Sequence, residues 1–459
     1  MSEAENDQQE FGSSLRLQAS LLDEPCPPGV PLTAKYKQGF AFKTIGHRLP
    51  VIITKVIDQL SRDKNDIGNT IGMDARDEVK IVVGDLAKLK NEMQTNKSIT
   101  KTESTVWNTY LGLMGQRYFD GKIEDVKWYF APWLFAECYM YKRLYDSFQS
   151  TKFLKDYDVF KKQKEDGWLQ SVDAACVLGE FVKTASDKFT DDEVMEDMLE
   201  VSLWGNRCDL SISEGEANSQ KHDIVDQLHE LRKNILCDDS ANFWTYLREK
   251  SSERQNCQNS NDTPVSIGYI LDNAGFELFT DLCFVDVLMK KVDRVDFHVK
   301  SIPWFVSDAL SQDFHWLIDS MIDATEYPIL TDLGKRWKNY VITKKWTVVE
   351  SQFWTYPHAY HEMACADSTL FDILQHNTVL IFKGDLNYRK LIGDVNWLPE
   401  TPFKEALQGF LPSPLLTLRT LKADCVAGLK PGVAQATQAK NADWMVTGEY
   451  GLIQFGCAS

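Results

Sequence analysis

The sequence lacks any cysteine pair with the two-residue spacing of zinc ribbons and thioredoxin-type redox motifs. Its ten cysteines are instead scattered from Cys26 to Cys457. This dispersed pattern is typical of reduced thiols in a cytoplasmic or nuclear protein, and we expect that localisation.

Long apolar runs are also missing. No uninterrupted stretch of about 18 apolar residues exists, so the sequence predicts no segment that spans a membrane. The first ten residues read MSEAENDQQE, which is acidic where a signal peptide needs a basic and then an apolar stretch. We therefore expect residues 1–22 to be a loose, polar N-terminus and not a signal peptide.

Positive charge is in short supply, because 50 Lys and Arg face 67 Asp and Glu, for a formal net charge of −17. Such a surface repels the phosphates of nucleic acids and of anionic membranes, so we expect neither as a partner. A small anionic substrate is compatible with this charge, because a local basic pocket or a metal can override the global field. With 459 residues, 43% of them hydrophobic and 25% charged, the composition is that of a globular protein with a large core.

The first half of the chain has the apolar periodicity of helices. Steps of three and four residues place one apolar stripe on a helix, formed by Val79, Val82, Leu86, Leu89 and Met93. Residues 190–193 (TDDE) have the pattern of a capping box, and we expect the helix that they start to stop at Gly205. Another helix is predicted over residues 223–237. Residues 23–255 are therefore expected to form a helical lobe.

The pattern changes after residues 250–264 (KSSERQNCQNSNDTP), a polar segment that we interpret as an exposed linker. Short β-type runs now alternate with helical stretches. Strands are expected at residues 265–271, 292–299, 346–349, 378–382, 415–421 and 444–446, and helices at residues 273–289 and 307–322. Strand followed by helix, repeated, predicts an α/β fold in which residues 265–459 form a mainly parallel sheet covered on both faces.

Polar residues follow several of these strands, at the end where ligands bind in open α/β sheets. Asp272 and Asn273 end the first strand, and Asp308 comes 36 residues after Asp272, behind an apolar run at residues 302–306. Two carboxylates and an amide offer hard oxygen ligands that suit Mg²⁺ or Mn²⁺. Arg389 and Lys422 follow two later strands and could hold an anionic group against that metal. Together these residues predict a metal-assisted phosphoryl site.

Each of these residues also has a purely structural interpretation. An Asp-Asn pair before a helix is more often an N-cap than a pair of ligands, and Asp308 could cap a helix of its own. The turn at Gly384 and Asp385 is ordinary by itself, and Arg389 or Lys422 could be a surface cation. Only their recurrence at one edge of the predicted sheet favours a site, so residue types and spacing leave both interpretations open.

Three segments carry a resemblance to a known family: residues 271–282 (LDNAGFELFTDL), 383–390 (KGDLNYRK) and 419–422 (RTLK). They closely resemble the metal-dependent damage-control phosphatases, in the branch with an RTxK signature that is also named acidic-residue or protein-glutamate methyltransferases. Residues 204–211 (WGNRCDLS) and the surroundings of Glu137 are similar to further parts of the family. The resemblance covers the chain from about Lys35 onward.

The resemblance implies an α/β/α sandwich behind a helical N-terminal region, with metal ligands at Asp272, Asn273 and Asp308. It implies Mn²⁺ or Ni²⁺ as the cofactor, with Co²⁺ or Mg²⁺ as alternatives. The implied substrates are small phosphorylated molecules, fructose 1-phosphate and fructose 6-phosphate among them. Substrate contacts would come from the metal ligands and from Asp385, Leu386, Asn387, Tyr388, Arg389 and Lys422.

The mechanism that we expect uses Asp272, Asp308 and Lys422 as the catalytic residues. The metal would neutralise charge that develops on a phosphate oxygen, and Lys422, with Arg389 or the backbone of the turn at Asp385, would balance the rest. Either a water molecule or the carboxylate of Asp272 could attack the phosphorus atom. The sequence leaves these two nucleophiles open.

Two other functions remain as alternatives. An S-adenosylmethionine-dependent protein carboxyl (glutamate) O-methyltransferase usually needs a glycine-rich turn between a strand and a helix, whereas the turn after the first strand holds only Gly275. A non-catalytic binding protein on the same fold would have no physical reason to keep the ligands and the cations together.

Smaller candidates lie outside this set. Asn206 and Asp209 could reach the site or could cap a loop after Gly205. Glu137 lies among aromatic residues, where a carboxylate needs a partner. Residues 358–362 (HAYHE) lack the HExxH spacing of a zinc site, and we expect their histidines to be structural.

Overall fold

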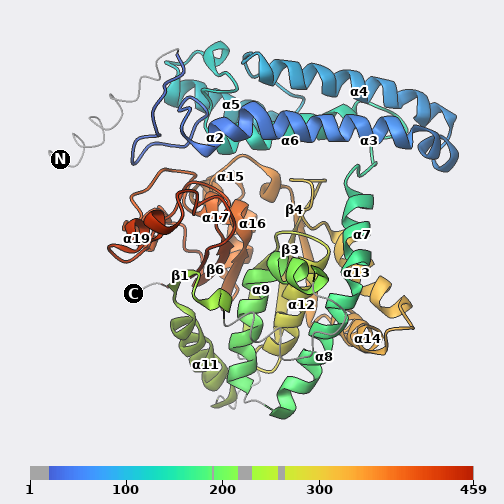
Figure 1. Cartoon of the computed structure of the whole chain (residues 1–459), viewed down its shortest axis with the longest axis vertical. Helices are drawn as coiled ribbons and strands as arrows, with labels where there is room; N and C mark the ends of the chain where they lie inside the picture. Colours follow the sequence, from blue (N-terminus) through green and yellow to red (C-terminus); the bar gives the residue numbers. More distant parts are fainter. Residues whose placement is uncertain (1–19, 189–190, 215–229, 257–263, 458–459) are drawn as a thin grey trace. The chain divides into compact units, whose positions relative to one another are not determined.

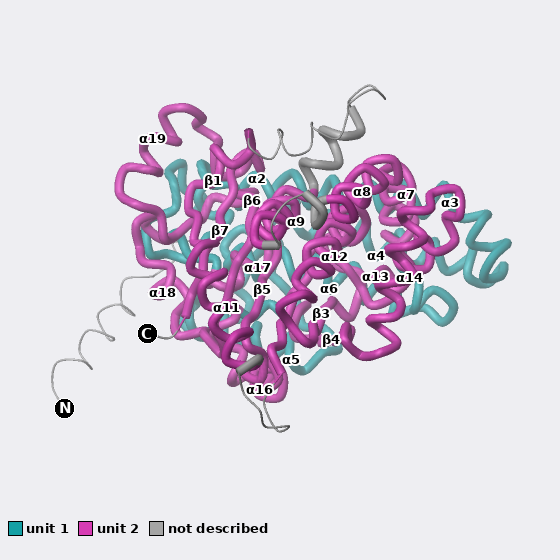
Figure 2. Tube along the Cα trace, turned by 90° about the horizontal axis from the view of Figure 1, so that it is seen from below, with its two compact units in different colours: residues 1–159, 356–358, 394–396 teal, residues 160–355, 359–393, 397–459 magenta. Residues whose placement is uncertain are grey.

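The computed structural model describes residues 20–188, 191–214, 230–256 and 264–457. The chain divides into two compact units (Figure 2). Unit 1 comprises Met1–Val159 and two short segments, Tyr356–His358 and Asp394–Asn396, and unit 2 comprises the rest of the chain. Within the described ranges, no helix combines the length and the apolar character that a membrane span requires.

Unit 1 is built from helices (Figure 1). The long helices α3 (Leu49–Thr70) and α4 (Met73–Gln94) pack along each other, and α6 (Trp133–Gln149) packs against α4. The apolar stripe from Val79 to Met93 is buried on α4, as its period predicted. The shorter elements of this unit are α2 (Phe40–Lys43), η1 (Thr44–Arg48), α5 (Thr105–Tyr118) and η2 (Ile123–Asp125).

Unit 2 contains a seven-stranded sheet with the strand order β1-β7-β6-β5-β2-β3-β4. All neighbouring strands are parallel except β6 and β7, which are antiparallel. The prediction of an α/β fold with a mainly parallel sheet is therefore confirmed. The strands are β1 (Ile235–Asp238), β2 (Ser266–Ile270), β3 (Arg294–Lys300), β4 (Trp346–Ser351), β5 (Val379–Lys383), β6 (Leu415–Thr420) and β7 (Gly451–Gly456).

The chain changes direction across the sheet at β2. It passes from β2 to β3 and β4 on one side, and then returns to β5, which pairs with the other side of β2. Such a reversal of strand order opens a crevice at the carboxyl ends of the strands, where open α/β sheets bind their ligands. The carboxyl ends of β2, β3, β5 and β6 all lie at this edge, because these four strands are parallel.

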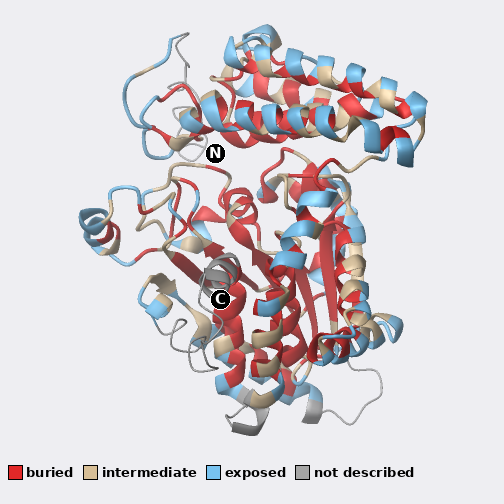
Figure 3. Cartoon of the chain, turned by 45° about the vertical axis from the view of Figure 1, so that its right-hand side comes forward, coloured by how far each residue is buried: buried red, intermediate tan, exposed pale blue. Residues whose placement is uncertain are grey.

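Helices cover both faces of the sheet, which makes the layered sandwich that the sequence predicted. Tyr269, Phe297 and Ile381 point to one face and share an apolar core with helices that include α8, α9 and α12, which lie side by side in Figure 1. Figure 3 shows the buried strands between the helical layers. The helices on this face are α7 (Lys161–Gln170), α8 (Val172–Lys188), α9 (Asp191–Glu214), α11 (Ser240–Asn256), α12 (Phe276–Leu288), α13 (Ser311–Asp323) and α14 (Pro328–Ile342).

The opposite face of the sheet carries Phe382 of β5 and Arg419 of β6. Phe382 contacts the ring of Tyr360, and Arg419 lies over the ring of Tyr388. The later part of the unit consists of η3 (Gln352–Thr355), η4 (Tyr360–Glu362), α15 (Met363–Ala366), α16 (Ser368–Gln375), α17 (Gly384–Leu391), α18 (Phe403–Ala406) and α19 (Val433–Lys440). Helices α7, α8, α9 and α11 thus belong to the same compact unit as the sheet, whereas the sequence placed residues 23–255 in a helical lobe.

Two strands were not anticipated. The helix predicted over residues 223–237 is wrong at its end, because Ile235–Asp238 forms the edge strand β1; residues 215–229 lie outside the described part of the chain. The strand predicted at residues 444–446 is also wrong, because these residues form a turn and the last strand is β7. Strand β1 has only four residues and is partly exposed, whereas β7 is buried but begins and ends with a glycine.

Gly205 does not end a helix, because α9 continues through it to Glu214. A Cβ atom on Gly205 would lie 2.6 Å from Oγ1 of Thr280 and 3.3 Å from Cγ of Glu277. The glycine is therefore needed where α9 approaches α12, and not as a helix stop. Asn206 and Asp209 continue the same helix, so no loop follows Gly205 for them to cap; their side chains lie outside the described part of the chain.

Candidate active site

The three predicted metal ligands come together at the carboxyl end of β2. The loops that follow β2 and β3 run antiparallel, with a bridge between Asn273 and Asp308. The N–H of Ala309 donates to the carbonyl of Asp272 (2.8 Å), and the N–H of Ala274 donates to the carbonyl of Ser307 (2.8 Å). These backbone hydrogen bonds hold two segments that are 36 residues apart in the sequence against each other.

The loop that delivers Asp308 has a strained backbone. The apolar run at residues 302–306 is not a strand, because β3 already ends at Lys300. Phe305 and Val306 have positive φ angles of 44° and 70°, a region that a β-branched residue rarely adopts. Such strain persists only where the surrounding structure fixes it, and here the tight turn directly precedes Ser307 and Asp308.

A glycine lets the third strand end reach this pair of loops. Gly384, directly after β5, has a φ of +87°, and a Cβ atom on it would lie only 1.9 Å from Oδ2 of Asp272. The turn between β5 and α17 therefore passes against the carboxylate of Asp272 with no room for a side chain. This close approach places the start of α17, where the predicted substrate contacts begin, beside the predicted metal ligands.

The carboxylates of the site are buried and mutually repulsive. Asp272 and Asp308 are only 9% and 3% exposed. Burial raises the pKa of Asp272 well above its ordinary value, the carboxylates of Glu277 and Asp308 raise it further, and Lys300 and Lys422 oppose the shift. Burial likewise raises the pKa of Asp308, against the effect of Lys300. A divalent cation at this position would relieve both the repulsion and the cost of burial.

The donor set fits a hard divalent metal ion. Asp272, Asn273 and Asp308 present only oxygen ligands from their acceptor atoms. Oδ2 of Asp308 is buried and accepts no hydrogen bond, although Nζ of Lys300 forms an ion pair with it at 3.2 Å. Among the described residues, no cluster of three or more His, Cys, Asp or Glu side chains is placed to bind a metal. The set therefore depends on the amide of Asn273 as well as on the two carboxylates.

Asp385 anchors the segment that contains Lys422. Its Oδ1 accepts hydrogen bonds from Nε of Arg419 (2.8 Å) and from the backbone N–H of Lys422 (3.0 Å). The guanidinium of Arg419 also donates to the carbonyls of Ala423 and Cys425, so it is fixed on all sides. The Lys422 side chain is exposed and lowers the pKa of Asp272, so its charge acts on the site.

The other residues of the predicted substrate segment are buried. The amide of Asn387 donates to the carbonyls of Lys383 (2.7 Å) and Leu271 (3.3 Å), which ties the ends of β5 and β2 together. The ring of Tyr388 stacks under the guanidinium of Arg419 at 4.2 Å. Leu386 and Arg389 are also buried on α17. The contacts of Asn387 and Tyr388 point inward and support the strand ends.

Sequence reasoning missed four charged residues next to the site. Lys300 ends β3 and binds Asp308, as described above. Glu277 accepts a hydrogen bond from the amide of Asn273 (2.8 Å), and Lys383 lies 3.3 Å from Glu277 and 3.2 Å from Asp281. One signal could have found the lysines, because Lys300 and Lys383 directly follow the strands predicted at residues 292–299 and 378–382.

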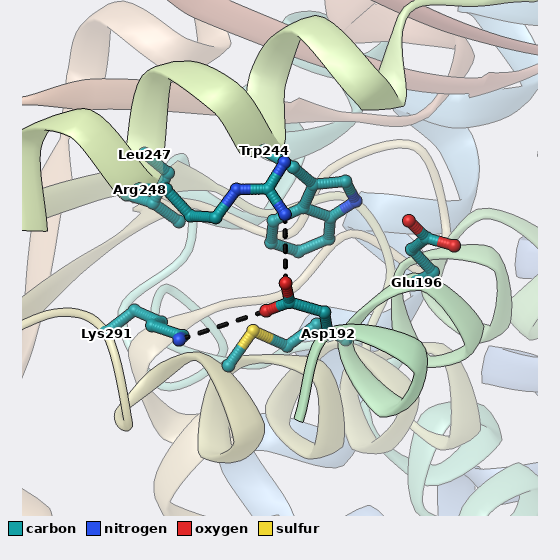
Figure 4. A pocket seen from close by; sticks show the side chains of 7 residues that line it. Asp192, Glu196, Trp244, Leu247, Arg248 and Lys291 are labelled. Atoms are coloured by element: carbon teal, nitrogen blue, oxygen red, sulfur yellow. Dashed lines mark hydrogen bonds and ion pairs between the residues drawn. The ribbon is translucent and has the colours of Figure 1, made fainter. Parts of the chain in front are cut away.

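The smaller candidates lie elsewhere. His358 is a buried residue of unit 1 that packs against the ring of Tyr110, and the carboxylate of Glu362 caps the start of η4. Glu137 is buried on α6 and has interaction partners. A separate small hollow in unit 2 lies between α9 and α11, where Asp192 pairs with Arg248 (2.9 Å) and Lys291 (3.8 Å) (Figure 4). Its opposite charges neutralise one another, so it offers no second anion site.

Comparisons with known proteins identify the relatives of this chain. A family model described as the Damage-control phosphatase ARMT1-like domain matches residues 44–437. The Mus musculus protein named Damage-control phosphatase ARMT1 is 39% identical over 438 residues, which cover 92% of this chain and 98% of that protein. The Danio rerio protein of the same name is 37% identical over 441 residues, which cover 93% and 97%. A solved structure of a DUF89 family protein from Pyrococcus horikoshii covers 86% of this chain and 93% of that chain at 15% identity, with a TM-score of 0.41.

Proposed function

This chain belongs to the damage-control phosphatase family, and we propose that it hydrolyses phosphate monoesters of sugars, of the fructose 1-phosphate or fructose 6-phosphate type, or of related damaged metabolites. The family is metal-dependent, and the predicted phosphatase class is confirmed at the level of the family. The observation that carries the proposal is that Asp272, Asn273 and Asp308 lie together at the carboxyl end of β2, where the strand order reverses.

The proposed metal ligands are these same three residues. A bound divalent cation, Mn²⁺ or Ni²⁺ in the first place and Co²⁺ or Mg²⁺ as alternatives, would supply Lewis-acid stabilisation of the negative charge on a phosphoryl oxygen. The buried acceptor Oδ2 of Asp308 and the repulsion between the carboxylates support this assignment. Lys300 holds Asp308 in place from the side of β3.

The proposed substrate contacts lie around the start of α17. Lys422 is exposed beside the site and can approach a phosphate, while Asp385 fixes its backbone. Arg389 is the proposed second cation, and the backbone N–H groups of the Asp385 turn can donate to phosphate oxygens. Asp272 has two possible roles, as a ligand that orients a water molecule or as the nucleophile itself. The second role requires a carboxylate that is free of tight metal bonds.

Phosphate release from a panel of sugar phosphates tests this proposal, with metal-stripped protein given Mn²⁺, Mg²⁺, Co²⁺ or Ni²⁺. We expect Asp308→Ala to lower turnover at least ~100-fold, because a ligand charge is lost at the point where negative charge develops. Lys422→Ala should weaken phosphate binding, whereas Lys440→Ala, which removes the same charge from an exposed position on α19, should change nothing. No release with any metal, or full activity of Asp308→Ala, would contradict the proposal, and binding of S-adenosylmethionine would then be measured.

A further inference from the structure

A network of buried polar side chains leads from Asn273 into the layer between the sheet and helices α9 and α12. Its members are Glu277 and Asp281 on α12, Lys383 at the end of β5, Ser202 on α9 and Tyr269 on β2. Each of them is at most 6% exposed. Buried polar groups are costly unless they are paired, so this network requires a specific arrangement of donors and acceptors.

The network begins at the amide of Asn273. Its Nδ2 donates two hydrogen bonds, to Oδ2 of Asp272 (3.0 Å) and to Oε2 of Glu277 (2.8 Å). Its Oδ1 accepts a hydrogen bond from the hydroxyl of Ser307 (2.6 Å). The two ends of an amide have nearly the same shape, but only the oxygen can bind a hard cation. The hydrogen-bond partners of one end of the amide therefore determine which end faces the metal.

Ser307 cannot decide this orientation, because a hydroxyl can either donate or accept and would fit both ends of the amide. Carboxylates only accept, so Asp272 and Glu277 require the NH₂ end. Building on the proposed metal site, we propose that Glu277 is a positioning residue that turns the Asn273 amide so that its oxygen faces the metal.

The surroundings explain why a glutamate is needed. Nζ of Lys383 lies 3.3 Å from Oε1 of Glu277 and 3.2 Å from Oδ1 of Asp281, and it donates to the carbonyl of Ser202. Glu277 thus has a donor on each side, the Asn273 amide and the Lys383 ammonium. A glutamine here would set its own NH₂ group against one of these two donors in either orientation.

Asp281 provides a matched control on the same lysine. Its Oδ1 accepts hydrogen bonds from the hydroxyls of Ser202 (2.6 Å) and Tyr269 (3.0 Å), but Asp281 has no hydrogen bond to Asn273 among those of the described residues. Asp281→Asn therefore disturbs the buried network about as much as Glu277→Gln does. It leaves the acceptor that holds the Asn273 amide unchanged.

The experiment measures Mn²⁺ affinity of the metal-stripped full chain by isothermal titration calorimetry, with the melting temperature of each variant recorded. Glu277→Gln should weaken Mn²⁺ binding about 10- to 100-fold, as outer-shell changes do. Asp281→Asn should lower the melting temperature similarly but change the affinity less than about threefold. Equal losses of affinity in the two variants would overturn the proposal.

Two further variants separate the possible failures. Asp308→Ala tests the metal site itself. Unchanged Mn²⁺ binding in that variant would refute the proposed metal site and with it the premise of the role of Glu277. Lost binding in Asp308→Ala, together with equal losses in Glu277→Gln and Asp281→Asn, would refute the role of Glu277 alone. Ser307→Ala alters no buried charge and remains informative if Glu277→Gln does not fold. It should keep the affinity within about threefold, and a larger loss than that of Glu277→Gln would show that Ser307 orients the amide.

Discussion

Replacing Gly384 by alanine is the smallest change that should disable the site. The added Cβ would lie 1.9 Å from Oδ2, 2.2 Å from Cγ and 2.8 Å from Cβ of Asp272. To regain an ordinary contact, the carboxylate would have to retreat by about 1.5 Å, away from the position it shares with Asn273 and Asp308. The φ angle of +87° adds strain that any L side chain suffers there.

The expected loss of stability in Gly384→Ala follows from these two effects, the close contact and the backbone strain. A left-handed φ costs about 1–2 kcal/mol for a residue other than glycine, and overpacking of a closed site costs about 1–3 kcal/mol. The free energy of unfolding should therefore fall by about 2–5 kcal/mol. Displacement of a reacting group by about 1 Å can lower turnover ~100-fold, so we expect at least that loss in Gly384→Ala.

Gly409 supplies the matched control, because it has the same φ of +87° but no atom within 4 Å of a Cβ. Gly409→Ala should carry only the backbone strain of about 1–2 kcal/mol and keep its activity. The assay compares Mn²⁺-dependent phosphate release, Mn²⁺ affinity and urea denaturation for both variants. If Gly384→Ala retained turnover and Mn²⁺ affinity within threefold of Gly409→Ala, the close packing of Gly384 against Asp272 would not matter for function.

Two further predictions concern stability. Gly205→Ala should lower the free energy of unfolding by about 1–3 kcal/mol, because its Cβ would lie 2.6 Å from Oγ1 of Thr280. Gly167→Ala on α7 has open space around it and should raise the free energy of unfolding by up to about 1 kcal/mol. Urea denaturation compares the two variants, and equal effects would contradict the packing argument. Burial raises the pKa of Glu200 from the ordinary 4.5 to about 7, against the hydrogen bond from Arg232 (2.7 Å). The folded state therefore binds more protons between these values, and the stability that Glu200 contributes is present below pH 4.5 and lost as the pH rises through 7. Glu200→Gln should flatten this fall in urea denaturation across the pH series, and an unchanged slope would refute the assignment.

Local patterns in the sequence were sufficient for the central strands and for the family. The runs that became β2 and β5 are mostly apolar, the run that became β3 alternates between apolar and polar residues, and those that became β4 and β6 are short and mostly apolar or β-branched, so local pattern alone revealed all five. Asp272 stood out because it follows the run that became β2, and Asp308 because it follows the apolar run at residues 302–306, which forms a loop. The assignment of Asn273 and of Lys422 to the site came from the resemblance as much as from position, and it remains a prediction.

Only the tertiary structure decided which neighbours these residues have. The sequence predicts that a helix ends at Gly205, but the glycine is needed for the close approach to Thr280, which lies 75 residues away in the sequence. Glu277, Asp281 and Lys383 carry no local signal of their mutual pairing, because a hydrogen bond across elements depends on how the helices pack on the sheet. The sequence by itself determined the class of sheet and the edge at which chemistry could occur. The fold determined which atoms meet there, since distances between residues far apart in the chain are set by packing and not by period.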